Sequence, residues 1–184
     1  MLPVAVGGYY LVTTFATAYA TDPAVGVRES LVLNALTITA FVELVVSFGA
    51  AWLGDRFGRV RVVVFGLVGV AALTDPQFLV LSTKNAALII AAFVAMRLAM
   101  TAIYSPIAAI LSQMFRPRAW YTSISLSYHL AGALFGGLSP LVSTLLSQAT
   151  GSVRPAIGLL IGVCVFSIAC VLAAPQHTDS PDTV

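Results

Sequence analysis

The segment LGDRFGRVR, from Leu53 to Arg61, is a short charged stretch between two long apolar runs. It holds three arginines and one aspartate, although the whole chain of 184 residues has only nine Lys and Arg and seven Asp and Glu. Charged side chains are costly inside hydrocarbon, so such a stretch needs water or lipid headgroups around it. The segment therefore predicts a turn at the edge of a membrane, between two helices that cross the bilayer.

Individual residues of this turn suit that position. Asp55 can accept hydrogen bonds from the backbone amides that open the next helix, where the helix dipole favours an anion. Gly58 permits a tight reversal of the chain or a close contact between helices. Arginines are enriched in cytoplasmic loops, so we expect this turn on the cytoplasmic side.

The composition points to a membrane protein as well. Hydrophobic residues make up 59% of the chain and charged residues 9%, whereas a soluble domain carries about 25% charged residues. The net charge of +2 comes from arginines at the membrane edge, so we expect no nucleic-acid partner. Cys164 and Cys170 lie in the last apolar run and are interpreted as reduced packing residues, with no metal site and no cofactor.

A helix needs about 20 mainly apolar residues to cross a bilayer. Residues 1–174 therefore predict an all-α bundle of six transmembrane helices, followed by a polar cytoplasmic tail at 175–184. The two loops on one side carry five arginines, and the alternate loops carry three basic residues mixed with acidic ones. This asymmetry places both termini in the cytoplasm. The predicted spans are 3–21, 31–53, 61–81, 86–113, 122–147 and 155–174.

Two charged residues fall near the middle of predicted spans. Glu43 lies about twelve residues into the second span and Arg97 about eleven into the fourth. An ionised side chain at that depth costs at least about 2.5 to 3.5 kcal/mol, so each needs a partner or a hydrated cavity. Two interpretations stay open: the residues line or couple a transport path, or they form a purely structural pair.

Polar residues at helical spacing mark one side of three spans. In the first, second and fourth spans they recur every three or four residues. In the fifth span a single histidine lies near two glycines spaced four apart, which favour close helix packing. The histidine can be a proton relay or a hydrogen-bonded packing residue. The residues that we expect to line a path, with Glu43 and Arg97, are Tyr10, Thr14, Thr101, Tyr104 and His129.

Five segments, in order along the chain, carry a resemblance to a known family. They are the Tyr- and Thr-rich first span through Tyr19, GDRFGR at Gly54–Arg59, QMFRPR at Gln113–Arg118, YTSISLSYHL at Tyr121–Leu130 and GGLSP at Gly136–Pro140. The chain resembles transporters of the major facilitator superfamily. Within that superfamily it is similar to the metabolite:proton symporters, which include shikimate, alpha-ketoglutarate, citrate and proline/betaine carriers.

The resemblance implies that the chain corresponds to helices seven to twelve, the C-terminal half of a twelve-helix carrier whose substrate binds near the midplane between two halves. The expected function is proton-coupled transport of a small organic acid or zwitterion across the plasma membrane. Arg97 would attract a carboxylate and Glu43 would exchange the proton. The half would need an N-terminal six-helix half or a second copy to rock against. The residues expected to gate the cytoplasmic side are Asp55, Arg56, Gly58 and Arg59.

Other functions were weighed against transport. With Met1 directly at a helix start, the chain could also be a truncated fragment that does not transport, or a partner subunit for another transporter half. An enzyme is disfavoured, because the sequence has no Gly-x-Ser-x-Gly, no His-Glu-x-x-His and no pair of membrane carboxylates. A channel is disfavoured by the lack of a filter-like loop or a ring of charge.

Overall fold

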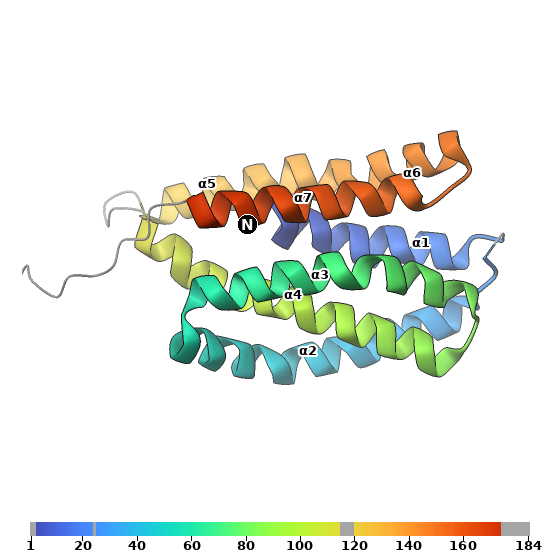
Figure 1. Ribbon diagram of the computed structural model, residues 1–184, viewed down its shortest axis with the longest axis horizontal. Helices are drawn as coiled ribbons and strands as arrows, with labels where there is room; N and C mark the ends of the chain where they lie inside the picture. The colour runs from blue at the N-terminus through green and yellow to red at the C-terminus, as the bar shows by residue number, and fades with distance from the viewer. Residues whose placement is uncertain (1–2, 24, 115–119, 174–184) are drawn as a thin grey trace, which may run out of the picture.

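The computed structural model describes residues 3–23, 25–114 and 120–173, and these residues form helices and short connections with no β-strand. The helices run side by side along the long axis of the molecule (Figure 1). One group contains α2, α3 and α4, and the other contains the first helix with the segments that follow α4. Contacts between α3 and α7 join the two groups.

The first helix is assembled from short segments. It runs through η1 (Pro3–Gly8), η2 (Leu11–Phe15) and α1 (Ala16–Thr21), and the two η segments are π-helical. A π-helix has i to i+5 hydrogen bonds and is rare, and it is often found near functional sites. This helix covers the first predicted span, but no segment of it is long enough to count as a membrane span by itself.

Five other helical stretches in the described part of the chain are long and apolar enough to cross a membrane. The protein is therefore an all-α membrane protein, and a sixth crossing by the first helix remains a prediction. The five stretches are Glu29–Phe57, Arg59–Ser82, Ala86–Ile107, Tyr121–Thr150 and Arg154–Ala173.

The charged stretch at 54–61 is almost entirely helical, which corrects the expectation of a loop. Helix α2 (Glu29–Phe57) continues through it, and α3 (Arg59–Ser82) begins one residue after Phe57. Gly58 alone separates them, with φ of +94° and ψ of 125°. Only glycine adopts such a conformation without strain, because it has no Cβ. One residue is therefore enough to reverse the chain.

The next helix, α4 (Ala86–Met114), begins at an asparagine cap. Oδ1 of Asn85 accepts hydrogen bonds from the backbone amides of Ala87 at 3.0 Å and Leu88 at 3.4 Å. This is a standard way to satisfy the free amides at a helix start. The arginines predicted in the loop after α4, Arg116 and Arg118, lie outside the described residues.

The last two helices complete the second group. The fifth predicted span contains α5 (Trp120–Ala131), the π-helical η4 (Gly132–Gly137) and α6 (Leu138–Thr150), which follow one another without a break. Gly151, at φ of +62°, ends α6 before α7 (Arg154–Ala173). The predicted polar tail at 175–184 lies outside the described residues.

Two glycines allow close contacts between helices. A Cβ added to Gly66 of α3 would lie 2.8 Å from the carbonyl oxygen of Ala99 in α4, and one added to Gly7 of η1 would lie 2.7 Å from Cβ of Phe135 in η4. A side chain at either position would push the helices apart. These contacts hold α3 on α4 and the first helix on η4, and thereby set the distances between the helices that carry the site.

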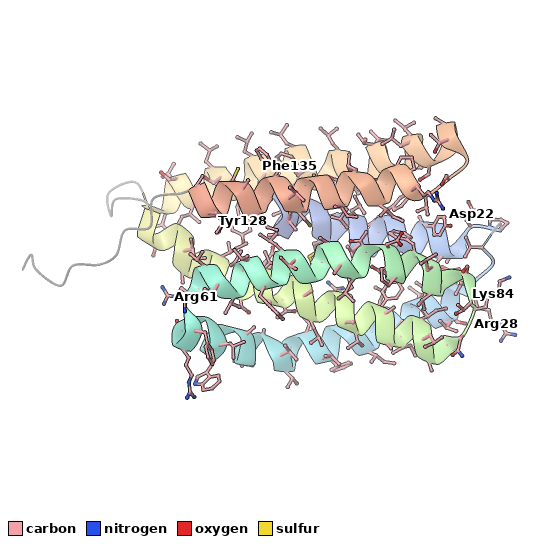
Figure 2. All side chains as sticks on the ribbon, in the orientation of Figure 1. Asp22, Arg28, Arg61, Lys84, Tyr128 and Phe135 are labelled. Atoms are coloured by element: carbon pink, nitrogen blue, oxygen red, sulfur yellow. The ribbon has the colours of Figure 1, made fainter. Side chains whose placement is uncertain are left out.

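The outer surface is apolar along the helices and charged at their ends. Large apolar side chains such as Phe41, Phe48 and Phe65 are mostly exposed, which is typical of a surface that meets lipid or another protein. Figure 2 shows Asp22, Arg28 and Lys84 at one end of the molecule and Arg61 at the other. Charge is therefore distributed as a bilayer requires.

Candidate functional site

The two mid-span charges meet each other across α2 and α4. Nη1 of Arg97 lies 3.4 Å from Oε2 of Glu43, and the side chains are 10% and 28% exposed. The same two helices are also joined closer to their C-terminal ends, where the hydroxyl of Ser105 donates to the carbonyl oxygen of Ser47 at 3.1 Å. This hydrogen bond fixes the register of α2 against α4 one turn beyond Glu43.

Arg97 is held by its surroundings more than by Glu43. Its Cζ lies 4.5 Å from the centre of the Tyr9 ring, a cation–π contact. Its carbonyl oxygen accepts a hydrogen bond of 2.8 Å from the hydroxyl of Thr101 in the same helix. Nη1 is buried and has no hydrogen-bond partner among the described residues, since its contact with Glu43 lacks hydrogen-bond geometry. Nη1 therefore faces the Glu43 carboxylate without a hydrogen bond of good geometry.

A small cavity lies beside Arg97. It offers about 10 Å³ to the centre of a water molecule, which is close to the minimum for a single water. Polar groups are available to such a water from Arg97, Tyr9 and Thr13, although the Thr13 hydroxyl already donates to the Tyr9 carbonyl oxygen at 2.7 Å. The cavity is lined by Tyr9, Val12, Thr13, Phe93, Arg97 and Met100.

Four tyrosines form a continuous row next to this pair, and we call them the tyrosine row: Tyr10, Tyr9, Tyr104 and Tyr128. Successive ring centres lie 6.1, 6.4 and 6.5 Å apart. The rings come from the first helix, α4 and α5. Tyr10 and Tyr104 are 48% and 41% exposed, so much of each ring is left uncovered by the chain. The row therefore combines packed rings with open ones.

Tyr9 and Tyr128 are absent from the path residues that the sequence predicts. In the first span, ordinary α-helical spacing from Tyr10 selects Tyr10 and Thr14. Helical spacing identifies residues that share a face, but it does not determine which face turns toward the neighbouring helices. The residues that reach Arg97 are Tyr9 and Thr13, one position earlier. The sequence signal that could have found Tyr9 is its position next to Tyr10, because two adjacent tyrosines on one helix place a ring on two neighbouring faces.

Other predicted path residues lie in different surroundings. Thr14 is exposed, and Thr101 is buried, with its hydroxyl bonded to its own helix. His129 is exposed on α5, where it lines a shallow hollow with Tyr121, Thr122, Ser125 and Leu126. That hollow shares no lining residue with the cavity beside Arg97. The structure thus brings Glu43 and Arg97 together, connects Tyr10 and Tyr104 to Arg97 through the ring of Tyr9, and leaves His129 apart. The path roles of all these residues remain predictions.

The charged stretch at the end of α2 forms a second, separate ion pair. Oδ1 of Asp55 accepts hydrogen bonds from Nη2 and Nε of Arg59 at 3.0 and 3.2 Å. Asp55 was expected to cap the helix that follows, and this prediction was wrong. Asp55 lies in the last turns of α2, and its carboxylate binds the guanidinium of Arg59, four residues later. Among the described residues, no side chain caps the start of α3.

Within α2, Arg56 lies over the rings of Trp52 and Phe57, with its Cζ 5.2 and 5.9 Å from their centres. Gly54 connects this stretch to α4, since a Cβ added to Gly54 would lie 3.6 Å from Cβ of Pro106. The turn therefore contacts the same helix that carries Arg97.

Comparison with known proteins assigns the chain to a family. The sequence profile of the Major Facilitator Superfamily matches residues 2–183. The chain is 27% identical over 149 residues to a putative proline/betaine transporter of Staphylococcus haemolyticus, an alignment that covers 81% of this chain and 31% of that protein. It is 26% identical over 177 residues to the ectoine/proline transporter ProP of Corynebacterium glutamicum, covering 94% and 34%.

A third relative has a different substrate. The shikimate transporter of Escherichia coli is 27% identical over 165 residues, covering 86% of this chain and 36% of that protein. The chain therefore spans about a third of the length of these curated relatives. No solved structure matches the chain.

Proposed function

Because the chain belongs to the Major Facilitator Superfamily, we propose that it forms one half of a carrier that moves a small organic acid or zwitterion together with protons. Membership of this family makes it a multi-pass metabolite transport protein and not an enzyme. The finer assignment, which includes the proton and the half-carrier, rests on the site between α2 and α4.

The pair of Glu43, which is partly buried, and Arg97, which is buried, is the observation that carries this proposal. A proton that binds Glu43 removes its negative charge, which leaves Arg97 without a counter-ion in a poorly hydrated place. Arg97 then attracts the carboxylate of a substrate instead. When the substrate leaves, Glu43 ionises again and pairs with Arg97. Proton and carboxylate are thus exchanged on one guanidinium, which links their movements.

A second half is required for alternating access, because carriers of this kind rock two halves around a site between them. The exposed rings of Tyr10 and Tyr104 suit a cavity that the missing half would close. The partner is an N-terminal six-helix half or a second copy of the chain. The relatives' names, which mention proline, betaine, ectoine and shikimate, support substrates of this size.

The arginine-rich turn is proposed to lie on the cytoplasmic side of the plasma membrane, together with both termini. There Asp55, Arg56, Gly58 and Arg59 would control closure. The close approach of Gly54 to Pro106 of α4 supports this role. Because α4 also carries Arg97, a movement of α4 at the ion pair would shift the residues that pack against Gly54 beside the turn.

Uptake measurements test the proposal. Cells that lack their own uptake of proline, betaine and shikimate would express the chain alone or with an N-terminal half of a relative, and labelled substrate would be followed. We expect Glu43→Gln and Arg97→Ala to abolish proton-dependent uptake. Glu29→Gln at the exposed start of α2 is the matched control and should transport normally. Full activity in both site variants would remove the pair from the mechanism.

A second candidate function follows from the share of the relatives' length that the chain covers. A protein with about a third of that length could be a fragment that does not transport, or a subunit for another half. The genomic DNA upstream of the first codon discriminates between the two. Six further spans there, in frame or after a frameshift, would favour the fragment.

A further inference from the structure

Arg97 has contacts in both groups of helices. Within the group of α2, α3 and α4, the carboxylate of Glu43 approaches its guanidinium at 3.4 Å. From the other group, the first helix contributes Tyr9, and the centre of that ring lies 4.5 Å from Cζ of Arg97. The cation therefore has two stabilising neighbours, a carboxylate from one group and an aromatic face from the other.

The contact with Tyr9 is the better formed of the two. A cation is attracted to an aromatic face within about 6 Å of the ring centre, and the distance to Tyr9 is well inside that limit. Arginine and a carboxylate usually join through hydrogen bonds of about 2.7 to 2.9 Å. Nη1 of Arg97 lies farther than that from Glu43, and it has no hydrogen-bond partner among the described residues. The guanidinium is therefore placed to suit the ring and not the carboxylate.

The Tyr9 ring is held in place by the packing of its own helix. It is half-buried, and the ring centres of Tyr10 and Tyr104 lie 6.1 and 6.4 Å away. A Cβ added to Gly7 would lie 2.7 Å from a side-chain atom of η4, and one added to Gly136 of η4 would lie 3.1 Å from the Tyr10 ring. The backbone around Tyr9 is thus fixed against η4, so the ring can set the position of the guanidinium.

The ring matters most when the carboxylate is neutral. While Glu43 is ionised, its charge compensates that of Arg97. A proton on Glu43 removes this compensation and leaves a buried guanidinium with the partial negative charge of the Tyr9 face beside it. A cation–π contact is stronger when the cation is shielded from water. Tyr9 therefore stabilises Arg97 in the state that the transport cycle has to pass through.

We propose that Tyr9 is a positioning residue, which holds the Arg97 guanidinium out of hydrogen-bond geometry with Glu43 and stabilises it while Glu43 is neutral. This inference rests on the proposed function, since it explains how the ion pair of the same site opens. Without the ring, Arg97 would turn toward Glu43 and form hydrogen bonds with it. A substrate carboxylate would then compete with a tighter internal partner.

A thermodynamic cycle between Tyr9 and Glu43 tests the inference without any substrate. The unfolding equilibrium constant of the purified chain in detergent would be measured for the wild type, Tyr9→Leu, Glu43→Gln and the double variant. Because both residues compensate one cation, we expect the constant of the double variant to be about tenfold larger than the two single effects multiplied together. A constant equal to that product, or smaller, would show that the ring does not support Arg97 and would overturn the inference.

Two further backgrounds separate the aromatic face from general packing. Tyr9→Phe keeps the face, so Glu43→Gln should have the same effect there as in the wild type. Tyr19→Leu is the matched control, since it removes a tyrosine of the same helix that packs on Phe15 and Phe78. A tenfold excess in the Tyr19→Leu background as well would assign the effect to packing and overturn the inference. If Tyr9→Leu does not fold, Tyr9→Met, which fills space without an aromatic face, replaces it in the cycle.

Uptake kinetics supply the second readout, with labelled proline, betaine and shikimate as probes. Tyr9→Leu should raise the KM of proton-dependent uptake about tenfold with a smaller change in kcat, and Tyr9→Phe should restore the KM. An unchanged KM, or a loss confined to kcat, would overturn the role of Tyr9 while the transport proposal stands. If the wild type takes up none of the probes, the proposed function fails, and the cycle by itself decides whether Tyr9 and Glu43 share Arg97.

Discussion

Two carboxylate–arginine pairs, Asp55–Arg59 and Glu43–Arg97, stand out in the described part of the chain, and they differ in geometry and in exposure. Asp55 and Arg59 lie 3.0 Å apart with side chains 65% and 34% exposed, and two hydrogen bonds join them. Glu43 and Arg97 lie 3.4 Å apart with side chains 28% and 10% exposed, and the contact lacks hydrogen-bond geometry. The pair with the better geometry is the one in contact with water or headgroups.

This difference shows that the hydrogen-bond geometry of an ion pair does not indicate how much the pair contributes to the free energy of unfolding. An exposed pair contributes about 0 to 1 kcal/mol even when its hydrogen bonds are good, because water and salt screen the charges. Removing one partner of a buried pair costs about 3 to 5 kcal/mol, because the other charge is left without compensation. A loose but buried pair is therefore suited to a switch, since each charge can be satisfied by the other or by a ligand.

The largest predicted effect is on the buried pair. Glu43→Leu should lower the free energy of unfolding by about 3 to 5 kcal/mol, since Arg97 would keep an uncompensated charge. Adding Arg97→Leu should recover most of that loss. Denaturant unfolding of the purified chain in detergent measures both values. A double variant no more stable than Glu43→Leu would show that the loss in Glu43→Leu does not come from the uncompensated charge of Arg97.

The next largest effect concerns the backbone at the turn between α2 and α3. Gly58→Ala should destabilise the protein by about 1 to 3 kcal/mol, because a side chain strains the positive-φ conformation. Gly49→Ala within α2 is the matched control. Neither glycine has an atom within 4 Å of an added Cβ, so the two sites differ in backbone conformation alone. Thermal unfolding compares them, and equal midpoints would contradict the prediction.

A smaller effect is expected at the hydrogen bond that sets the register near the buried pair. Ser105→Ala removes the bond to the Ser47 carbonyl and should cost about 0.5 to 1.5 kcal/mol. Ser82→Ala, whose hydroxyl bonds within its own helix at an exposed site, should cost less. The same unfolding assay compares the two variants. An equal loss of unfolding free energy would show that the hydrogen bond between helices contributes no more than one within a helix.

The smallest effect on stability belongs to the exposed pair. Asp55→Asn should change the free energy of unfolding by about 1 kcal/mol or less, with the difference shrinking as salt rises. Its uptake rate should fall if the turn controls closure. Stability measured across a salt series, beside the uptake assay, tests both parts. A loss as large as that of Glu43→Leu would remove the contrast between the pairs.

Much of the fold could be predicted from local pattern. The membrane class follows from hydropathy, and the predicted second, third and fourth spans agree closely with α2, α3 and α4, because long apolar runs between charged residues leave little freedom. The reversal at Gly58 was also foreseen, though its extent was not. Residues 54 to 57 belong to α2, because none of them is a proline and Gly54 keeps a helical conformation. The helix ends only at Gly58, which has positive φ.

The site was predicted less completely, because its members come from different helices. Glu43 and Arg97 were identified by their depth, but depth does not choose between a pair and two separate path residues. Tyr9 and Tyr128 were missed, since the rotation of the first helix about its axis and the approach of α5 to α4 have no signature in a 3.6-residue repeat. His129 was grouped with the path by its depth and by its helical face beside Gly132, and the structure puts it in a separate hollow.

Hydropathy and charge are properties of each segment alone, so the amino-acid sequence already specifies long apolar helices with charged ends and two costly charges at mid-depth. That those charges pair, that Arg97 lies on Tyr9 and that four tyrosines join into one row follow from the packing of the helices. Such contacts depend on how closely helices approach and how they are rotated, which packing at small residues such as Gly7 and Gly66 sets.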